Sequence, residues 1–283
     1  MADIPEEGAV YYATAERYVE EAARSATSLK RHGDIHTTLF TTVDGVPAVF
    51  DNVQRIDEGE SPWIHRIEQL KRTPYDRTLY LDTDTFVTGN IEPLFDLLDR
   101  FDIAAALDQV RDTSYGEVDI DVPEPFPEYN CGVILYRNTP AVMDMMDDWQ
   151  EGYARHRDAD VKDQPFFRQA VYESDLQICT LPTEYDLQYG KPNFLQQEAR
   201  ILHGRFEMVT TPLLSRGYTF EDMVERINRD APLRRVIRPK WGKMRVRTGE
   251  PSVLDQILRG TRKYGATEAL KRGIRKVFSI NRE

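Results

Sequence analysis

The stretch that decides the fold is RTLYLDTDTFV, residues 77–87. Apolar residues dominate its first part, as expected of a strand buried in a parallel sheet. Two carboxylates separated by one residue, Asp82 and Asp84, follow this apolar part. Carboxylates beside a buried strand are unfavourable unless their charge is compensated, and a divalent cation with oxygen ligands would compensate it. The pattern therefore indicates a metal site, with a solvated acidic turn as the alternative.

Outward from this stretch, predicted strands and helices alternate along the chain. We expect strands at 8–14, 35–43, 49–56, 77–87, 102–107, 129–137, 178–181 and 200–203. We expect helices at 15–31, 62–71, 92–98, 140–156 and 164–172, and a long loop at 109–128. Such alternation predicts an α/β fold with a mainly parallel central sheet and helices on both faces. In sheets of this kind, ligands bind beyond the carboxyl ends of the strands.

The composition is that of a globular protein with a sizeable core. The chain has 283 residues, of which 40% are hydrophobic, so one large domain is expected. Its two cysteines, Cys131 and Cys179, predict free thiols in a reduced compartment. No apolar run approaches the roughly 18–20 residues that span a bilayer, and the acidic start does not resemble a signal peptide. We therefore expect a soluble, cytoplasmic protein.

The net charge of −11 is unevenly distributed. Residues 231–283 hold 15 Lys and Arg against 4 Asp and Glu, whereas residues 1–230 are strongly acidic. We therefore divide the chain into a catalytic domain, 1–230, and a basic helical C-terminal extension, 231–283. An amphipathic helix is predicted in the extension from the spacing of Leu270, Ile274, Val277 and Phe278. Two alternatives stay open: this helix docks on the acidic domain, or it contacts an anionic membrane peripherally at the inner face.

Four segments, in chain order, resemble glycosyltransferase family 8, the glycogenin and bacterial galactosyltransferase-like enzymes. They are YLDTDTFV at 80–87 with the Ile-Glu-Pro-Leu-Phe helix after it, YNCGVILYR at 129–137, Lys-Asp-Gln at 162–164 and Leu-His-Gly at 202–204. The resemblance extends over residues 8–206, and the shared order is more specific than any single segment. It implies the Rossmann-like GT-A fold and a glycosyltransferase that uses a nucleotide-diphosphate sugar as donor.

The resemblance also implies a metal centre. Asp82, Asp84 and His203 would hold Mn²⁺ or Mg²⁺ as the cofactor, and imidazole with carboxylates suits Mn²⁺ better than Ca²⁺. On the residues alone, an isolated histidine beside an apolar strand is more often a core residue than a ligand. The position of His203 in the matching segment is what favours the ligand interpretation.

Further roles follow from the resemblance. Tyr11 or Tyr12 would stack on the nucleotide base; neighbouring strand residues face opposite ways, so only one of them is expected to contact ligand. The other residues expected to bind the nucleotide sugar are Arg66, Thr83, Asp108, Asn130, Gly132 and Arg205. Gln164 would lie near the anomeric carbon, with Asp163 beside it, as the catalytic pair. The alternatives are core packing for one tyrosine, a surface position for Arg66, and an exposed loop for Asp163 and Gln164.

The chain also departs from the family. Cys131 replaces the usual serine, and the Lys-Pro-Trp that usually follows the His203-Gly204 pair is absent. Either Arg205 supplies the missing positive charge to the diphosphate, or that contact is lost.

The expected reaction moves a hexose from the donor to an acceptor hydroxyl with retention of configuration. The acceptor, whether glycan, lipid-linked sugar or protein, is not indicated, and we expect no nucleic acid partner. A nucleotidyltransferase would need a Gly-x-Gly-Thr-Arg loop, which GAVYYATAERY at 8–18 lacks. The other alternative is a non-catalytic protein that binds a nucleotide sugar or an anionic surface.

Overall fold

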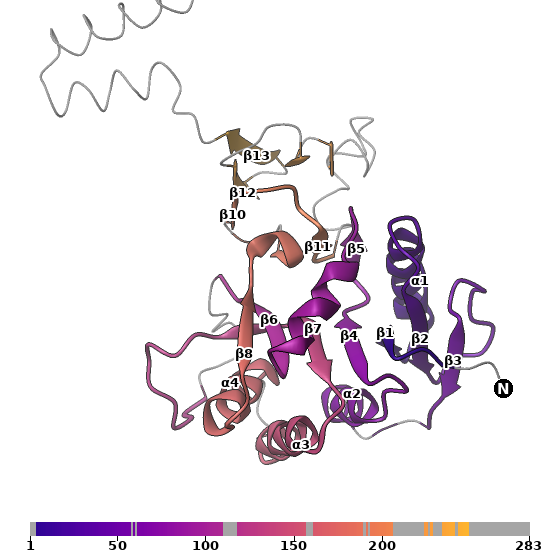
Figure 1. The fold of residues 1–283 in the computed structure, drawn as a ribbon, viewed down its shortest axis with the longest axis vertical. Helices are drawn as coiled ribbons and strands as arrows, with labels where there is room; N and C mark the ends of the chain where they lie inside the picture. The colour runs from indigo at the N-terminus through magenta and orange to yellow at the C-terminus, as the bar shows by residue number, and fades with distance from the viewer. Residues whose placement is uncertain are drawn as a thin grey trace, which may run out of the picture.

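The body of the molecule is built on one seven-stranded sheet (Figure 1). The computed structural model describes residues 4–57, 59, 61–109, 118–156, 161–188, 191, 193–205, 224–225, 227–228, 234–240 and 243–248. None of the helices in these ranges has the length and hydropathy required to cross a membrane.

The order of strands in the main sheet is β3-β2-β1-β4-β7-β6-β8. These strands are β1 Glu7–Ala13, β2 His36–Thr41, β3 Asn52–Arg55, β4 Arg77–Leu81, β6 Ile103–Leu107, β7 Tyr129–Arg137 and β8 Ile178–Leu181. Pairing is parallel between β1 and β2, β1 and β4, β2 and β3, and β6 and β8. Only β7 runs antiparallel to its neighbours β4 and β6. The predicted mainly parallel α/β sheet is therefore confirmed.

Helices cover both faces of this sheet. They are α1 Glu16–Lys30, the 3₁₀ helix η1 Glu92–Asp99, α2 Pro62–Lys71, α3 Pro140–Ala154 and α4 Gln164–Glu173. In β4, Leu79 and Leu81 join the cluster beneath α1 and η1, while Tyr80 joins the cluster beneath α2, α3 and α4. This alternation is the period of two expected of a strand. Full burial of such side chains stabilises the fold by roughly 1.5–3 kcal/mol each.

The predicted single strand at 77–87 is wrong, because the chain changes sheet in its middle. The strand β4 ends at Leu81, and the backbone N–H of Asp82 donates to the carbonyl of Gly132 at 2.7 Å. The carbonyl of Asp82 then accepts from both the backbone N–H and the hydroxyl of Thr85, at 3.1 and 2.8 Å. These bonds close a turn at the carboxyl end of β4, and β5 continues in another sheet.

That second sheet has the order β5-β11-β9. Its strands are β5 Thr85–Val87, β11 Ile201–His203 and β9 Leu187–Gln188, and the short 3₁₀ helix η3 Thr183–Tyr185 precedes β9. The strand β11 pairs antiparallel with β5, so that His203 lies opposite Thr85. This pairing places His203 beside the turn at Asp82, although the two residues are distant in sequence.

A third sheet contains β10 Asn193–Leu195, β12 Arg234–Lys240 and β13 Lys243–Thr248. The described part of 231–283 is therefore strand and not helix, and it pairs with a strand from before residue 231. The amphipathic helix predicted around 270–278 lies outside the described residues. Cys131 and Cys179 are free thiols, as expected.

Candidate functional site

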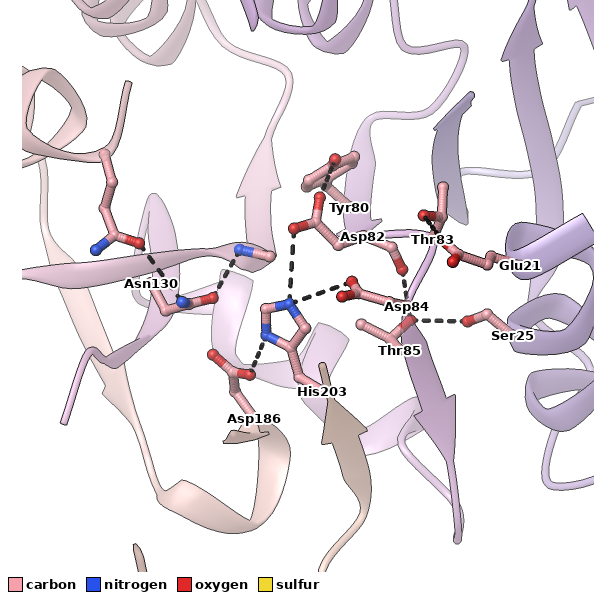
Figure 2. A network of polar contacts seen from close by, with 12 residues as sticks. Glu21, Ser25, Tyr80, Asp82, Thr83, Asp84, Thr85, Asn130, Asp186 and His203 are labelled. Atoms are coloured by element: carbon pink, nitrogen blue, oxygen red, sulfur yellow. Dashed lines mark hydrogen bonds and ion pairs between the residues drawn. The ribbon is translucent and has the colours of Figure 1, made fainter. Parts of the chain in front are cut away.

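The three predicted metal ligands meet at the carboxyl end of β4. Atoms of Asp82, Asp84 and His203 that could hold an ion all lie within 4.8 Å of one another. The Nε2 atom of His203 is 3.6 Å from Oδ2 of Asp82 and 3.5 Å from Oδ1 of Asp84 (Figure 2). The backbone N–H of Gly204 donates to the carbonyl of Asp84 at 3.1 Å, which fixes β11 against the turn. The side chain of His203 is 11% exposed and faces carboxylates with both of its ring nitrogens.

The orientation of the His203 ring is set by Asp186, a residue that the sequence analysis missed. The Nδ1 atom of His203 lies 2.8 Å from Oδ1 of Asp186, whose side chain has no exposed surface. Burial opposes protonation of His203, but Asp186 raises its pKa well above the ordinary value. A carboxylate on Nδ1 directs Nε2 toward the two other ligands, the usual arrangement of a metal-binding histidine. Nothing in the local sequence distinguishes Asp186 from an ordinary loop residue.

The space beside these ligands depends on Gly132. A Cβ atom at this position would lie 2.1 Å from Cε1 of His203 and 2.9 Å from Oδ2 of Asp82. The close approach of β7 is possible only because residue 132 has no side chain. Two carboxylates and one imidazole around such a space fit Mn²⁺ or Mg²⁺.

Arg66 lies inside this centre and not on the surface. Its side chain is 4% exposed, and it pairs with Asp163 and, at 3.4 Å, with Oδ1 of Asp82. Burial opposes ionisation of Asp82, yet the nearby imidazole of His203 and the charge of Arg66 hold its pKa below the ordinary value. Burial raises the pKa of Asp163 despite the pairing with Arg66. The hydroxyl of Tyr80 donates to the Asp82 oxygen that Arg66 contacts.

A second polar cluster gathers around Gln164, the predicted catalytic residue. Its Nε2 donates to Oδ2 of Asp108 at 3.0 Å and to Oε1 of Glu128 at 2.5 Å. Asn130 donates to Oε1 of Gln164 and to Oδ2 of Asp108, both at 3.5 Å. The Oδ1 atom of Asn130 accepts from the backbone N–H of Gly132 at 2.8 Å, which links this cluster to the metal centre.

The two members of the predicted catalytic pair belong to different clusters. Asp163 is buried and faces Arg66, while Gln164 begins α4 and faces Asp108. Lys191 also pairs with Asp108, whose side chain is 2% exposed. Neither member occupies the exposed loop that was the alternative. Glu128 and Lys191 were not anticipated from the sequence, because neither stands in a recognisable motif.

The two tyrosines of β1 face opposite ways, as expected. Tyr11 is fully buried; its hydroxyl lies 3.1 Å from Oγ of Ser25, and its ring packs edge-on against Phe50. Tyr12 is partly exposed, with its hydroxyl 3.3 Å from Nδ1 of His65. This geometry assigns Tyr11 to the core and leaves Tyr12 as the residue available to a ligand.

Thr83 and Arg205 converge on α1. The hydroxyl of Thr83 donates to Oε2 of Glu21 at 3.0 Å, and Nε of Arg205 is 3.8 Å from the other oxygen of Glu21. The guanidinium of Arg205 lies over the ring of Tyr18, 5.3 Å from its centroid. Tyr18 and Glu21 were also missed, although their spacing of three residues on a helix is a signal for a shared face.

Comparisons with known proteins can be set beside this geometry. Residues 75–212 match the family model described as nucleotide-diphospho-sugar transferase. No curated protein matches the chain.

Three solved structures of low sequence identity resemble it. The glycosyltransferase GlyE of Streptococcus pneumoniae TIGR4 is 20% identical, with a TM-score of 0.48 over 66% of this chain and 48% of GlyE. An active-site mutant of LgtC is 17% identical, with a TM-score of 0.49 over 65% of this chain and 74% of LgtC. Mouse xyloside xylosyltransferase 1 is 15% identical, with a TM-score of 0.49 over 71% of this chain and 98% of that protein. The chain thus spans about half the length of GlyE.

Proposed function

Because residues 75–212 of the chain belong to the nucleotide-diphospho-sugar transferase family, we propose that the protein moves a hexose from a nucleotide-diphosphate sugar to an acceptor hydroxyl. The proposal includes a divalent cation, Mn²⁺ or Mg²⁺, held by Asp82, Asp84 and His203. It also includes retention of the anomeric configuration.

One observation carries the metal-dependent part of this proposal. The turn after β4 and the end of β11, far apart in sequence, bring Asp82, Asp84 and His203 within 4.8 Å of one another. Like-charged carboxylates gathered in one place disfavour folding unless a cation compensates for them. Arg66 compensates for part of the charge, but it contacts Asp82 on Oδ1, whereas Oδ2 faces His203. Oδ2 of Asp82 and the carboxylate of Asp84 are therefore the oxygens available to an ion.

The roles of the side chains follow from their positions. A bound divalent ion would neutralise charge on the diphosphate leaving group. Arg66 holds Asp82 and Asp163 in place, and Asp186 holds the ring of His203. Asp108, Asn130 and Gln164 present carboxylate and amide groups that suit the hydroxyls of a sugar. Tyr12 would contact the base, and Arg205, beside Thr83, would contact the diphosphate.

Retention places Gln164 on the reacting face of the sugar. The side-chain amide of Gln164 is a weak nucleophile and a weak base. It lies beside the carboxylates of Asp108 and Glu128. We propose that the acceptor hydroxyl attacks on the face from which the diphosphate leaves, and that the leaving phosphate takes its proton. An NMR assignment of the anomeric configuration in the transfer product tests this directly, and an inverted product overturns it.

The proposed activity is tested by a panel of UDP-, GDP- and dTDP-sugars with the full chain. We expect one donor to raise the melting temperature in the presence of Mn²⁺ and to be hydrolysed slowly to the nucleoside diphosphate. The Asp84→Asn variant should lose both effects while remaining folded. Metal-dependent stabilisation without turnover, even with added acceptors, would favour a non-catalytic binding protein instead.

A further inference from the structure

We propose that Glu128 is a positioning residue that fixes the side-chain amide of Gln164, so that its oxygen faces the metal centre. The inference rests on the proposed function, because it assigns to Gln164 a place in the reaction. Glu128 lies two residues before Asn130, at the edge of β7, and contributes nothing to the metal ligands.

The hydrogen bonds of the cluster distinguish the nitrogen of the Gln164 amide from its oxygen. The Nε2 group of Gln164 has two hydrogens, and two carboxylates accept from it, Asp108 at 3.0 Å and Glu128 at 2.5 Å. The Oε1 atom is on the opposite side, 3.5 Å from the Nδ2 donor of Asn130. All donors and acceptors of the amide are therefore matched in one orientation.

The reversed orientation is strongly disfavoured. A rotation by 180° would bring Oε1 against two carboxylates, neither of which has a hydrogen to donate when ionised. Hydrogen bonds to an ionised acceptor are shorter and roughly twice as strong as neutral ones. Because Asp108 also pairs with Lys191, Glu128 provides a second negative charge that keeps the amide nitrogen on this side.

The fixed amide is connected to the metal centre. Asn130 donates to Gln164 and accepts from the backbone N–H of Gly132, where an added Cβ would meet His203. Removal of the Glu128 carboxylate would let the amide rotate, and the Gln164 oxygen would then spend part of its time away from this chain of contacts. A misplaced group of this kind lowers the rate of the chemical step more than it weakens substrate binding.

The first test measures steady-state hydrolysis of UDP-glucose and UDP-galactose with Mn²⁺. We expect Glu128→Ala to lower kcat about 10- to 100-fold with KM nearly unchanged. We expect Glu128→Gln to recover only part of the loss, because a neutral glutamine can accept from the Gln164 amide but can also donate to a reversed one. In a Gln164→Ala background, Glu128→Ala should have no further effect on kcat. Equal losses in both backgrounds, or a Glu128→Gln variant as fast as the wild type, would overturn the proposal.

A matched control lies on the same helix. Gln169 of α4 donates to Glu173 at 2.8 Å; Gln169 is partly exposed and Glu173 is exposed. The Glu173→Ala variant thus removes a glutamate that accepts from a glutamine without touching the site, and it should leave kcat unchanged.

The second test requires no turnover. In ¹⁵N NMR spectra of the full chain, we expect the Gln164 side-chain NH₂ to exchange slowly with solvent in the wild type and at least 10-fold faster in Glu128→Ala. Unchanged exchange would refute the role of Glu128. If the wild type binds none of the nucleotide sugars but Glu128→Ala still accelerates this exchange, the proposed function fails and the positioning contact stands.

Discussion

Replacement of Gly132 by alanine should abolish tight Mn²⁺ binding while the protein remains folded. The new Cβ would lie 2.1 Å from Cε1 of His203, 2.6 Å from its Nε2 and 2.9 Å from Oδ2 of Asp82. Carbon atoms in contact are separated by about 3.5 Å, so the imidazole must move by roughly 1.4 Å. Ligand distances tolerate only about 0.2 Å. Asp186 holds the ring from its other side, at 2.8 Å, so His203 would be lost as a ligand.

The size of the effect can be estimated by mass action. Loss of one ligand from three should weaken Mn²⁺ binding about 100-fold, which corresponds to about 2.7 kcal/mol. At a Mn²⁺ concentration 100 times the wild-type Kd, the ion stabilises the wild type by about 2.7 kcal/mol and the variant by about 0.4 kcal/mol. The melting temperature should therefore rise by about 5–10 °C in the wild type and by about 1 °C in Gly132→Ala.

Isothermal titration with MnCl₂ and thermal unfolding measure these quantities. Gly152→Ala is the control, because Gly152 is a buried glycine of α3 whose added Cβ would have its nearest contact with Phe166, at 3.3 Å. It should bind Mn²⁺ as the wild type does. If folded Gly132→Ala binds Mn²⁺ within threefold of the wild-type Kd, the ion is not held between Asp82 and His203, and the assignment of the metal centre is refuted.

Three other predictions concern charged side chains. Asp186→Ala should weaken Mn²⁺ binding 10- to 100-fold in titration calorimetry, because His203 loses the group that orients it. Arg66→Met should lower the free energy of unfolding, measured in urea, by about 3–5 kcal/mol, because Asp163 is left buried without its cation. Asp51→Asn should lower the free energy of unfolding by less than about 1 kcal/mol at pH 7, because the ion pair of Asp51 with Lys30 is partly exposed. This difference from the wild type should disappear when unfolding in urea is measured at acid pH.

The sign of the Asp51 prediction comes from its folded-state pKa. Burial opposes ionisation, but Lys30 and Thr37 hold the pKa of Asp51 below its ordinary value of 3.8. The stabilisation is therefore complete above pH 3.8 and is lost as the pH falls through the lower, folded value. A difference between wild type and Asp51→Asn that persists at pH 2 would contradict this reasoning, whereas Asp44→Asn, on a fully exposed carboxylate, should match the wild type throughout.

Much of the fold could be predicted because its signals are local. The strand β7 was predicted with its observed bounds, 129–137, since a short, mostly apolar stretch after a loop is typical of a buried strand. The helix α3 was likewise predicted to within two residues at its end. At 77–87 the pattern of apolar residues was the only information. Because it predicts a strand in both halves of this stretch, it did not reveal that the chain changes sheet between them.

Contacts between residues that are distant in sequence could not be predicted from the sequence. The missed residues Asp186 and Glu128 act through partners far along the chain, His203 and Gln164. Neither stands in a motif. Asp186 precedes β9 and Glu128 precedes β7, so their roles are visible only when these strands meet β11 and α4 in the folded chain. The same limit left Tyr11 and Tyr12 undecided until the packing of β1 against α1 was known.

From its residues alone, the chain determined an α/β sheet with two carboxylates at the end of a buried strand, because hydrophobic periodicity and the cost of buried charge are local properties. Only the tertiary structure decided that Asp82 and Asp84 face His203 across β5 and β11, with Asp186 behind it and Gly132 leaving room beside it. The reason is physical: strand register and close approach depend on contacts between segments that are distant in sequence, and no short stretch of chain contains them.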